Sequence, residues 1–320
     1  MRITNNMMAN SFMTDMNNNL ENLDRIRQQL TSGKNFSKPS HDPAGVIRSM
    51  QLYSGIDANK QYNKNISNVI NWLDVTDTAL DQVGKQLGKI RDKLEEAGNP
   101  GFGETERKAL KDEVNGIIAS MSQTLNTTFD GKYIFSGTRV TGKPTGVQKD
   151  ATTKNNSIDY VNKDGSIPLD PAGDEYKQME QKLKAEISEG VVMEYNVTAT
   201  EVLEGGGDLR QFLEDIVKHL DSDDPKEISK LYGDDLGNID KALDNVLRIR
   251  AEVGAKQNRM DAAKEMNKET NFNMTEILSN IEDVNLVEKN MEYAILQSVY
   301  ISSLQTSAKV LQPTLMDYLR

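Results

Sequence analysis

The feature that most constrains this chain is the spacing of its apolar residues, which recur every three or four positions over long tracts. Such spacing predicts amphipathic helices. The first helix is expected to stop at Gly33 and Pro39, the second covers 66–94 and the third covers 110–125. The short segment "AGNPGFGE" before the third helix predicts that the last two are antiparallel. The apolar stripe of the first helix contains Leu20, Leu23, Ile26 and Leu30.

Helical spacing returns after three glycines at 205–207, which we interpret as a hinge. A helix over 209–220 is predicted to begin with Asp208 as its N-cap. A very long helical tract follows from residue 236 to the end, where Pro313 is expected to kink or fray the last turns. Its final stripe, close to the 3.5-residue repeat of a coiled coil, contains Ile301, Leu304, Ala308, Leu311, Leu315 and Leu319.

The middle of the chain, residues 131–204, has a different composition, rich in Gly, Thr, Tyr and Val and in turn dipeptides. Asp164-Gly165 is a hairpin turn signal between two short runs. Apolar and polar residues alternate over 193–199, which predicts a half-buried strand. A short helix is expected before Gly190, with one face made of Tyr176, Met179, Leu183 and Ile187.

The predicted fold class is therefore mainly α with a β-rich insert, an α+β arrangement of nested layers. Residues 1–40 and 281–320 form terminal helices, 41–130 and 205–280 form a coiled-coil-like helical bundle, and 131–204 form a separable outer domain. The terminal helices carry apolar stripes but have no core of their own, which predicts that these stripes pack against partner helices. The expected assembly interface contains Leu20, Leu23, Ile26, Leu30, Leu304, Leu311, Leu315 and Leu319.

Composition excludes several classes of function. The formal net charge of −11 and the absence of a basic stripe disfavour nucleic acid as a partner. The chain has no cysteine, which excludes disulfides and thiolate metal sites, and its two histidines cannot form an HExxH pair. No stretch approaches the roughly 18 apolar residues of a membrane helix, so membrane insertion is not expected. Composition alone leaves a cytoplasmic and an exported location open.

One stretch, "SGKNFSKPSHDPAGV" at 32–46, places Ser40, His41 and Asp42 side by side, the residue types of a hydrolase triad. Adjacent side chains point apart, whereas a triad gathers its members from distant positions of the chain. The same letters begin a helix well, because Asp42 can act as its N-cap and Pro43 can take the first helical position. We therefore interpret Ser40, Asp42 and Pro43 as an inter-domain hinge and helix cap.

The remaining polar motifs favour no chemistry. In "DSDDP" at 221–225, Pro225 and Lys226 occupy positions where a calcium loop needs a ligand and a glycine. His219 lies near the end of an amphipathic helix, where a cation suits the helix dipole, and is expected on the surface. We predict no catalytic residue, cofactor or metal site, and hence no enzyme.

Four collinear motifs carry a family resemblance. They are "MRITNNMM" at the start, "LTSGKNFSKPSHDPAGV" after the first helix, "GKYIFSGT" at 131–138 and "SLQTSAKVLQPTLMDYLR" at the end. Together they resemble the flagellin superfamily over the entire chain, more weakly in the insert. The family's Ser-Asp-Asp-Pro falls on 40–43, where His41 replaces the middle acid.

The resemblance implies a structural subunit of the bacterial flagellum, secreted unfolded through the flagellar type III export apparatus. Its paired terminal helices would form an inner tube layer. The partners it implies are neighbouring copies in a ring, another hook-associated protein, flagellin and an export chaperone. The "GKYIFSGT" motif and the ending "LMDYLR" favour the hook–filament junction proteins, with a filament flagellin as the alternative.

Two readings from other classes are weaker. An enzymatic insert is disfavoured because residues 131–204 contain neither His nor Cys and offer no nucleophile–base pair. A generic coiled-coil adaptor explains the terminal helices but not the four ordered motifs.

Overall fold

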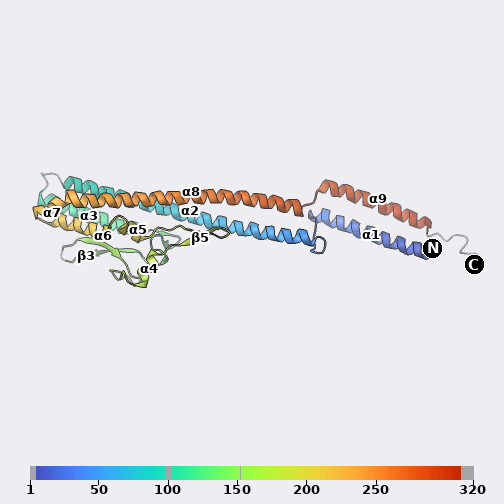
Figure 1. Cartoon of the computed structure of the whole chain (residues 1–320), viewed down its shortest axis with the longest axis horizontal. Coiled ribbons are helices and arrows are strands. Elements are labelled where there is room, and N and C mark those ends of the chain that lie inside the picture. Colours follow the sequence, from blue (N-terminus) through green and yellow to red (C-terminus); the bar gives the residue numbers. More distant parts are fainter. Residues whose placement is uncertain (1–4, 98–102, 152, 311–320) are drawn as a thin grey trace, which may run out of the picture. The chain divides into compact units, whose positions relative to one another are not determined.

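The computed structural model describes residues 5–97, 103–151 and 153–310, and Figure 1 traces its elements. The chain forms two compact units, one made of residues 1–60 and 269–320 and the other of residues 61–268. The predicted fold class is confirmed, because long helices precede and follow a small β-containing middle region in the sequence. The three-part division with boundaries at 40, 130, 204 and 280 stays a prediction.

The first unit holds the helices of both chain ends. These are α1 (Asn5–Ser32), α9 (Leu286–Val310), the beginning of α2 (Pro43–Ala97) and the end of α8 (Leu236–Glu282). The long tract expected after residue 236 is thus two helices. Asn285 separates them, since its Oδ1 accepts hydrogen bonds from the backbone N–H groups of Val287 and Glu288 at 3.2 and 3.4 Å, as an N-cap does. A small cluster of Leu52, Ile56 and Leu278 joins α2 to α8 here.

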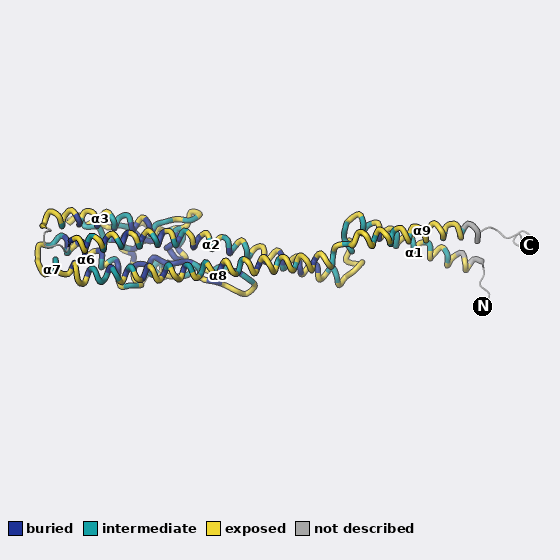
Figure 2. Tube along the Cα trace, turned by 90° about the horizontal axis from the view of Figure 1, so that it is seen from above, coloured by how far each residue is buried: buried dark blue, intermediate teal, exposed yellow. Residues whose placement is uncertain are grey.

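The second unit is built on four helices, the long central parts of α2 and α8 together with α3 (Glu104–Leu125) and α6 (Leu209–Asp221). The predicted stripes over 66–94 and 110–125 are confirmed as its core. Figure 2 shows this buried seam between the helices. The largest fully buried side chains of the helices include Leu73, Leu80, Leu87, Ile90, Leu94, Ile118, Met121 and Leu125.

A short helical segment leads from α6 into α8. It consists of α7 (Pro225–Lys230) and a π-helical turn, η1 (Leu231–Asp235). Asp208 caps α6, as predicted, because its side chain accepts a hydrogen bond from the backbone N–H of Arg210. Asp224 caps α7 in the same way and Pro225 follows at the first helical position. The acidic run at 221–225 is thereby used as a helix start.

The middle region contains three antiparallel two-stranded hairpins and two short helices. Strand β1 (Thr128–Phe129) pairs with β2 (Lys132–Tyr133), β3 (Thr145–Lys149) with β4 (Asn156–Tyr160), and β5 (Lys184–Ser188) with β6 (Val191–Glu194). Helix α4 (Asp174–Glu180) lies between the second and third hairpins, and α5 (Ala199–Glu204) follows the last strand.

Three local predictions for this region were wrong. The expected helix ends at Glu180, because Gln181 adopts an extended backbone, and Ile187 lies on β5 instead. The turn at Asp164-Gly165 exists, with Gly165 at a φ of +89°, but it joins no pair of strands. The strand expected over 193–199 stops at Glu194. Beyond it the chain is held by Asn196, whose Oδ1 accepts from the backbone N–H of Leu183 at 2.7 Å.

The middle region shares one hydrophobic core with the helices. Phe135, Tyr160 and Met179 are buried in the same cluster as the α2 and α3 stripes. The expectation that the helices pack without the insert therefore disagrees with the observed core. The glycines at 205–207 have a packing role whether or not they also act as the predicted hinge. A side chain at Gly206 would lie 2.7 Å from the carbonyl oxygen of Lys241, so glycine allows close packing against α8.

Candidate assembly surface

The terminal helices α1 and α9 pack along each other within the first unit. Of the predicted interface residues, Ile26 is buried and Leu23 and Leu30 are half-buried, whereas Leu20 and Leu304 stay exposed. Leu311, Leu315 and Leu319 lie outside the described residues. The pairing therefore covers only part of the predicted interface in a single chain.

A second apolar row runs along α9 and is not covered. It consists of Val287, Met291, Ile295 and Val299, here called the α9 row, and these side chains are 43% to 72% exposed. Residues four positions apart follow one side of a helix, so the row is continuous. The segment 293–308 beside it contains no charged residue. A long uncharged and exposed helix face is typical of a surface that other helices cover.

Sequence reasoning missed most of the α9 row, although its four-residue spacing is visible in the sequence. The helix carries apolar residues on more than one side. Spacing identifies each side as apolar but does not tell which one the partner helix within the chain covers.

The connections at the base of the terminal helices, residues 33–42 and 283–285, form a joint. The sequence predicted a hinge in the first connection but not its contacts with the second. The Lys34 ammonium group contacts Glu282 Oε2 at 2.8 Å and Asp283 Oδ1 at 2.9 Å. Hydrogen bonds to these two carboxylates raise the pKa of Lys34, with Glu282 the stronger cause. The Tyr53 hydroxyl donates to Glu282 Oε2 at 2.8 Å, and this bond raises the pKa of Tyr53.

Backbone bonds tie the two connections of the joint together. The N–H of Asn35 donates to the carbonyl of Glu282 at 2.6 Å, and the N–H of Val284 donates to the carbonyl of Gly33 at 3.0 Å. Gly33 adopts a φ of +70°, a conformation that favours glycine. The joint therefore fixes where α1 ends and α9 begins relative to each other.

The stretch Ser40-His41-Asp42 does not have the geometry of a triad. Asp42 Oδ1 accepts a hydrogen bond from the backbone N–H of Gly45 at 3.0 Å, which is the geometry of a cap on α2. The three residues are exposed at the start of α2, with Pro43 as its first residue. Their role as an inter-domain hinge stays a prediction.

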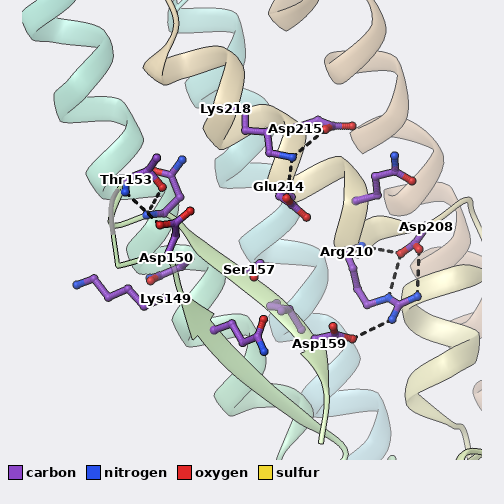
Figure 3. Close-up of a pocket in the computed structure, with 15 residues that line it drawn as sticks. Lys149, Asp150, Thr153, Ser157, Asp159, Asp208, Arg210, Glu214, Asp215 and Lys218 are labelled. Atoms are coloured by element: carbon purple, nitrogen blue, oxygen red, sulfur yellow. Dashed lines mark hydrogen bonds and ion pairs between the residues drawn. The ribbon is translucent and has the colours of Figure 1, made fainter. Parts of the chain in front are cut away.

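A polar hollow beside α6 is a competing candidate for a site (Figure 3). Two of the cations that line it, Arg210 and Lys218, are paired with neighbouring carboxylates. Arg210 pairs with Asp159 and Asp208, each at 3.0 Å, and its guanidinium lies over the Tyr160 ring at 4.4 Å from the centroid. Lys218 contacts Glu214 at 2.6 Å. The Asp159–Arg210 pair joins β4 to α6, whereas the other two pairs lie within α6 and its N-cap, so all three serve the fold.

Among the described residues, no group of three or more His, Asp or Glu side chains could hold a metal ion. Within the same part of the chain, none of the helices is both long and apolar enough to cross a membrane.

Comparison with known proteins identifies related sequences at both ends of the chain. Residues 3–140 match the bacterial flagellin N-terminal helical region, and residues 236–319 match the bacterial flagellin C-terminal helical region. Flagellar hook-associated protein 3 of Escherichia coli is 24% identical over 293 residues, which are 89% of each chain. A flagellin of Bacillus subtilis is 23% identical over 297 residues, 92% of this chain and 90% of the flagellin.

Solved structures share the fold. A putative flagellar hook-associated protein from Vibrio parahaemolyticus superposes with a TM-score of 0.61 at 21% identity, covering 76% of this chain and all of that one. Flagellar hook-associated protein 3 from Legionella pneumophila gives a TM-score of 0.59 at 14% identity, covering 72% of this chain and 98% of the other.

Proposed function

This chain belongs to the bacterial flagellin family, and we propose that it is a structural subunit that joins the flagellar hook to the filament. The observation that carries this proposal is the end-to-end match to a hook-associated protein 3, over 89% of both chains. A comparable match to a filament flagellin keeps that role as the alternative. The motifs "GKYIFSGT" and "LMDYLR" favour the junction.

The α9 row supports a role in self-assembly. Neighbouring copies would cover Val287, Met291, Ile295 and Val299 with their own terminal helices, closing a ring of subunits. Each such side chain contributes roughly 1.5 to 3 kcal/mol when fully buried. The joint fixes the end of α1 next to the beginning of α9, so the two helices can pack against neighbouring copies as one element.

The partners follow from that position. One side of the ring would contact another hook-associated protein and the other side would contact flagellin. Before assembly, an export chaperone would cover the apolar terminal helices, and the chain would reach the outer end of the hook through the flagellar export apparatus. The role we propose is structural and includes no reaction, and Arg210 and Lys218 of the hollow beside α6 are used in ion pairs within the fold.

The behaviour of the purified full chain tests the junction against the filament role. A filament flagellin polymerises into long filaments when seeds are added, whereas a junction subunit is expected to stop after short rings or remain monomeric. Negative-stain electron microscopy of the seeded and unseeded protein measures this. Long filaments that grow with protein concentration would favour the flagellin alternative.

A further inference from the structure

We infer that His219, Glu227 and Asp235 form a proton-dependent clasp, which fastens the segment 222–235 to helix α6 and releases it as the pH rises. The segment contains α7 and the π-helical turn η1, and it leads into α8. The clasp lies within the second unit and is separate from the terminal helices.

Both ring nitrogens of His219 face carboxylates. Nδ1 lies 2.6 Å from Asp235 Oδ2 and Nε2 lies 3.0 Å from Glu227 Oε2. The side chain of His219 is 12% exposed and that of Asp235 is 5% exposed, so the expectation of a surface histidine was wrong. The π-helical turn places Asp235 at this point, where η1 packs against α6. Such turns are rare and are frequently found at functional sites.

The number of protons in the clasp decides its stability. A neutral imidazole has one N–H group, and a carboxylate can only accept. With a neutral ring and two carboxylates, one of the two contacts would therefore place an unprotonated ring nitrogen against a carboxylate oxygen, and both of these atoms are acceptors. One additional proton, on the ring or on a carboxyl group, removes that opposition. The closed clasp thus holds one proton more than the open segment does at neutral pH.

The sign of the pH effect follows from this proton. Burial, the largest cause, raises the pKa of Asp235, although its hydrogen bond to His219 acts in the opposite sense. A group whose pKa is raised by folding stabilises the closed state at low pH, and this contribution is lost as the pH rises through the folded-state value. Release of one proton increases the opening constant at most tenfold per pH unit. The comparison therefore runs from mildly acidic to mildly alkaline pH, the direction in which the additional proton of the closed clasp is released.

The charges around the clasp are predominantly negative. Lys230 of α7 donates to the other oxygen of Glu227, Oε1, at 2.9 Å. Further charged groups lie on α6 and on the elements packed against it. They include Asp215 and the Glu214–Lys218 pair on α6 itself, Lys226 on α7, Asp234 on η1, Lys111 and Arg107 of α3 with their partners Asp221 and Asp223, and Asp159 of β4 and Glu204 of α5 with their partner Arg210.

Apart from the clasp, the segment is attached by three side chains. Leu231 of η1 is fully buried in the main core, Ile228 of α7 packs against that core, and Asp223 pairs with Arg107 at 3.2 Å. None of the six residues of α7 is buried. Opening of the clasp is therefore expected to expose the backbone N–H groups of 226–235 before those of the long helices.

Hydrogen–deuterium exchange of the full chain at about pH 6 and about pH 8.5, with labelling times scaled to the intrinsic exchange rate, tests the clasp. Protection of a peptide covering 225–235 should fall at the higher pH, by at most about tenfold per pH unit. A peptide covering 80–94 of α2 should keep its protection. An unchanged protection of 225–235 would overturn the proposal.

The matched control is Glu227→Gln. Its amide can donate to the ring nitrogen, and its oxygen can still accept from Lys230, so both contacts are satisfied without an additional proton. The pH response of 225–235 should disappear while the segment stays protected. His219→Gln, which does not titrate, should also lose the response. If either variant retains the wild-type pH response with the α2 peptide intact, the clasp is not its cause.

Discussion

Replacing Ile295 and Val299 by aspartate is expected to leave the chain folded and to remove it from the flagellum. Both side chains belong to the exposed α9 row, so the isolated chain loses no core contact. In the assembled ring, however, two apolar contacts would be lost, each worth at most roughly 1.5 to 3 kcal/mol because the side chains are already partly covered in the single chain. The variant would also have to bury two carboxylates without partners. Together these terms predict a fall in incorporation of more than about a hundredfold.

The measurement is complementation in cells that lack the chain, together with the melting temperature of the purified variant. Ile295→Val with Val299→Ile is the matched control, because it keeps the row apolar and should be incorporated normally. An aspartate variant that still enters the flagellum would show that the α9 row is not an assembly surface. One that melts many degrees lower would show that the row supports the monomer.

Phe135→Ala is expected to destabilise the helical bundle by about 3 to 5 kcal/mol, although the residue lies in the β-containing region. Phe135 is fully buried in the cluster that contains the α2 and α3 stripes, and its carbonyl accepts from the backbone N–H of Ala199 at 2.8 Å. Removing the ring leaves a cavity between the insert and the helices. Denaturant unfolding followed by helical circular dichroism measures the loss.

Val192→Ala is the control for this prediction, because Val192 belongs to the same insert but is 56% exposed on β6. It should change the free energy of unfolding by less than about 0.5 kcal/mol. A helical transition unaffected by Phe135→Ala would mean that the insert folds on its own core, as the sequence predicted. Replacement of residues 131–204 by a Gly/Ser linker should then also leave the bundle intact.

The long helices were predictable from the sequence because their signal is local and repeated many times. Each turn of α2 between Ile66 and Leu94 adds another apolar residue to the same side, and these residues are buried as expected. Helix starts were predictable for the same reason. Asp208 and Asp42 each precede their helix directly, and both accept a backbone hydrogen bond there.

Short elements were harder because two periods can fit the same letters. Leu183 and Ile187 are four positions apart, which fits one face of a helix and equally one face of a strand. The extended conformation of Gln181 decides for the strand. The motif "GKYIFSGT" shows the opposite case, in which the structure requires one particular residue type at a position of the motif. A side chain at Gly137 would lie 2.2 Å from the carbonyl oxygen of Met179.

The contacts that the sequence could not reveal join distant positions. Lys34 and Glu282 are 248 positions apart, so no spacing rule connects them before the helices are paired. His219 and Asp235 are 16 positions apart, and their contact depends on the π-helical turn. The sequence predicted that the candidate assembly surface lies on apolar terminal helices. It did not predict which side of these helices is exposed, because the pairing of α1 with α9 decides which side remains free.

The location of the labelled chain on intact flagella tests the central claim most directly. An epitope placed in the exposed turn at Gly190, between β5 and β6, belongs to the second unit and leaves the sequence of the terminal helices unchanged. Immunogold electron microscopy should then show a single band where the hook meets the filament. Label distributed along the whole filament would contradict the account and identify the chain as a filament subunit.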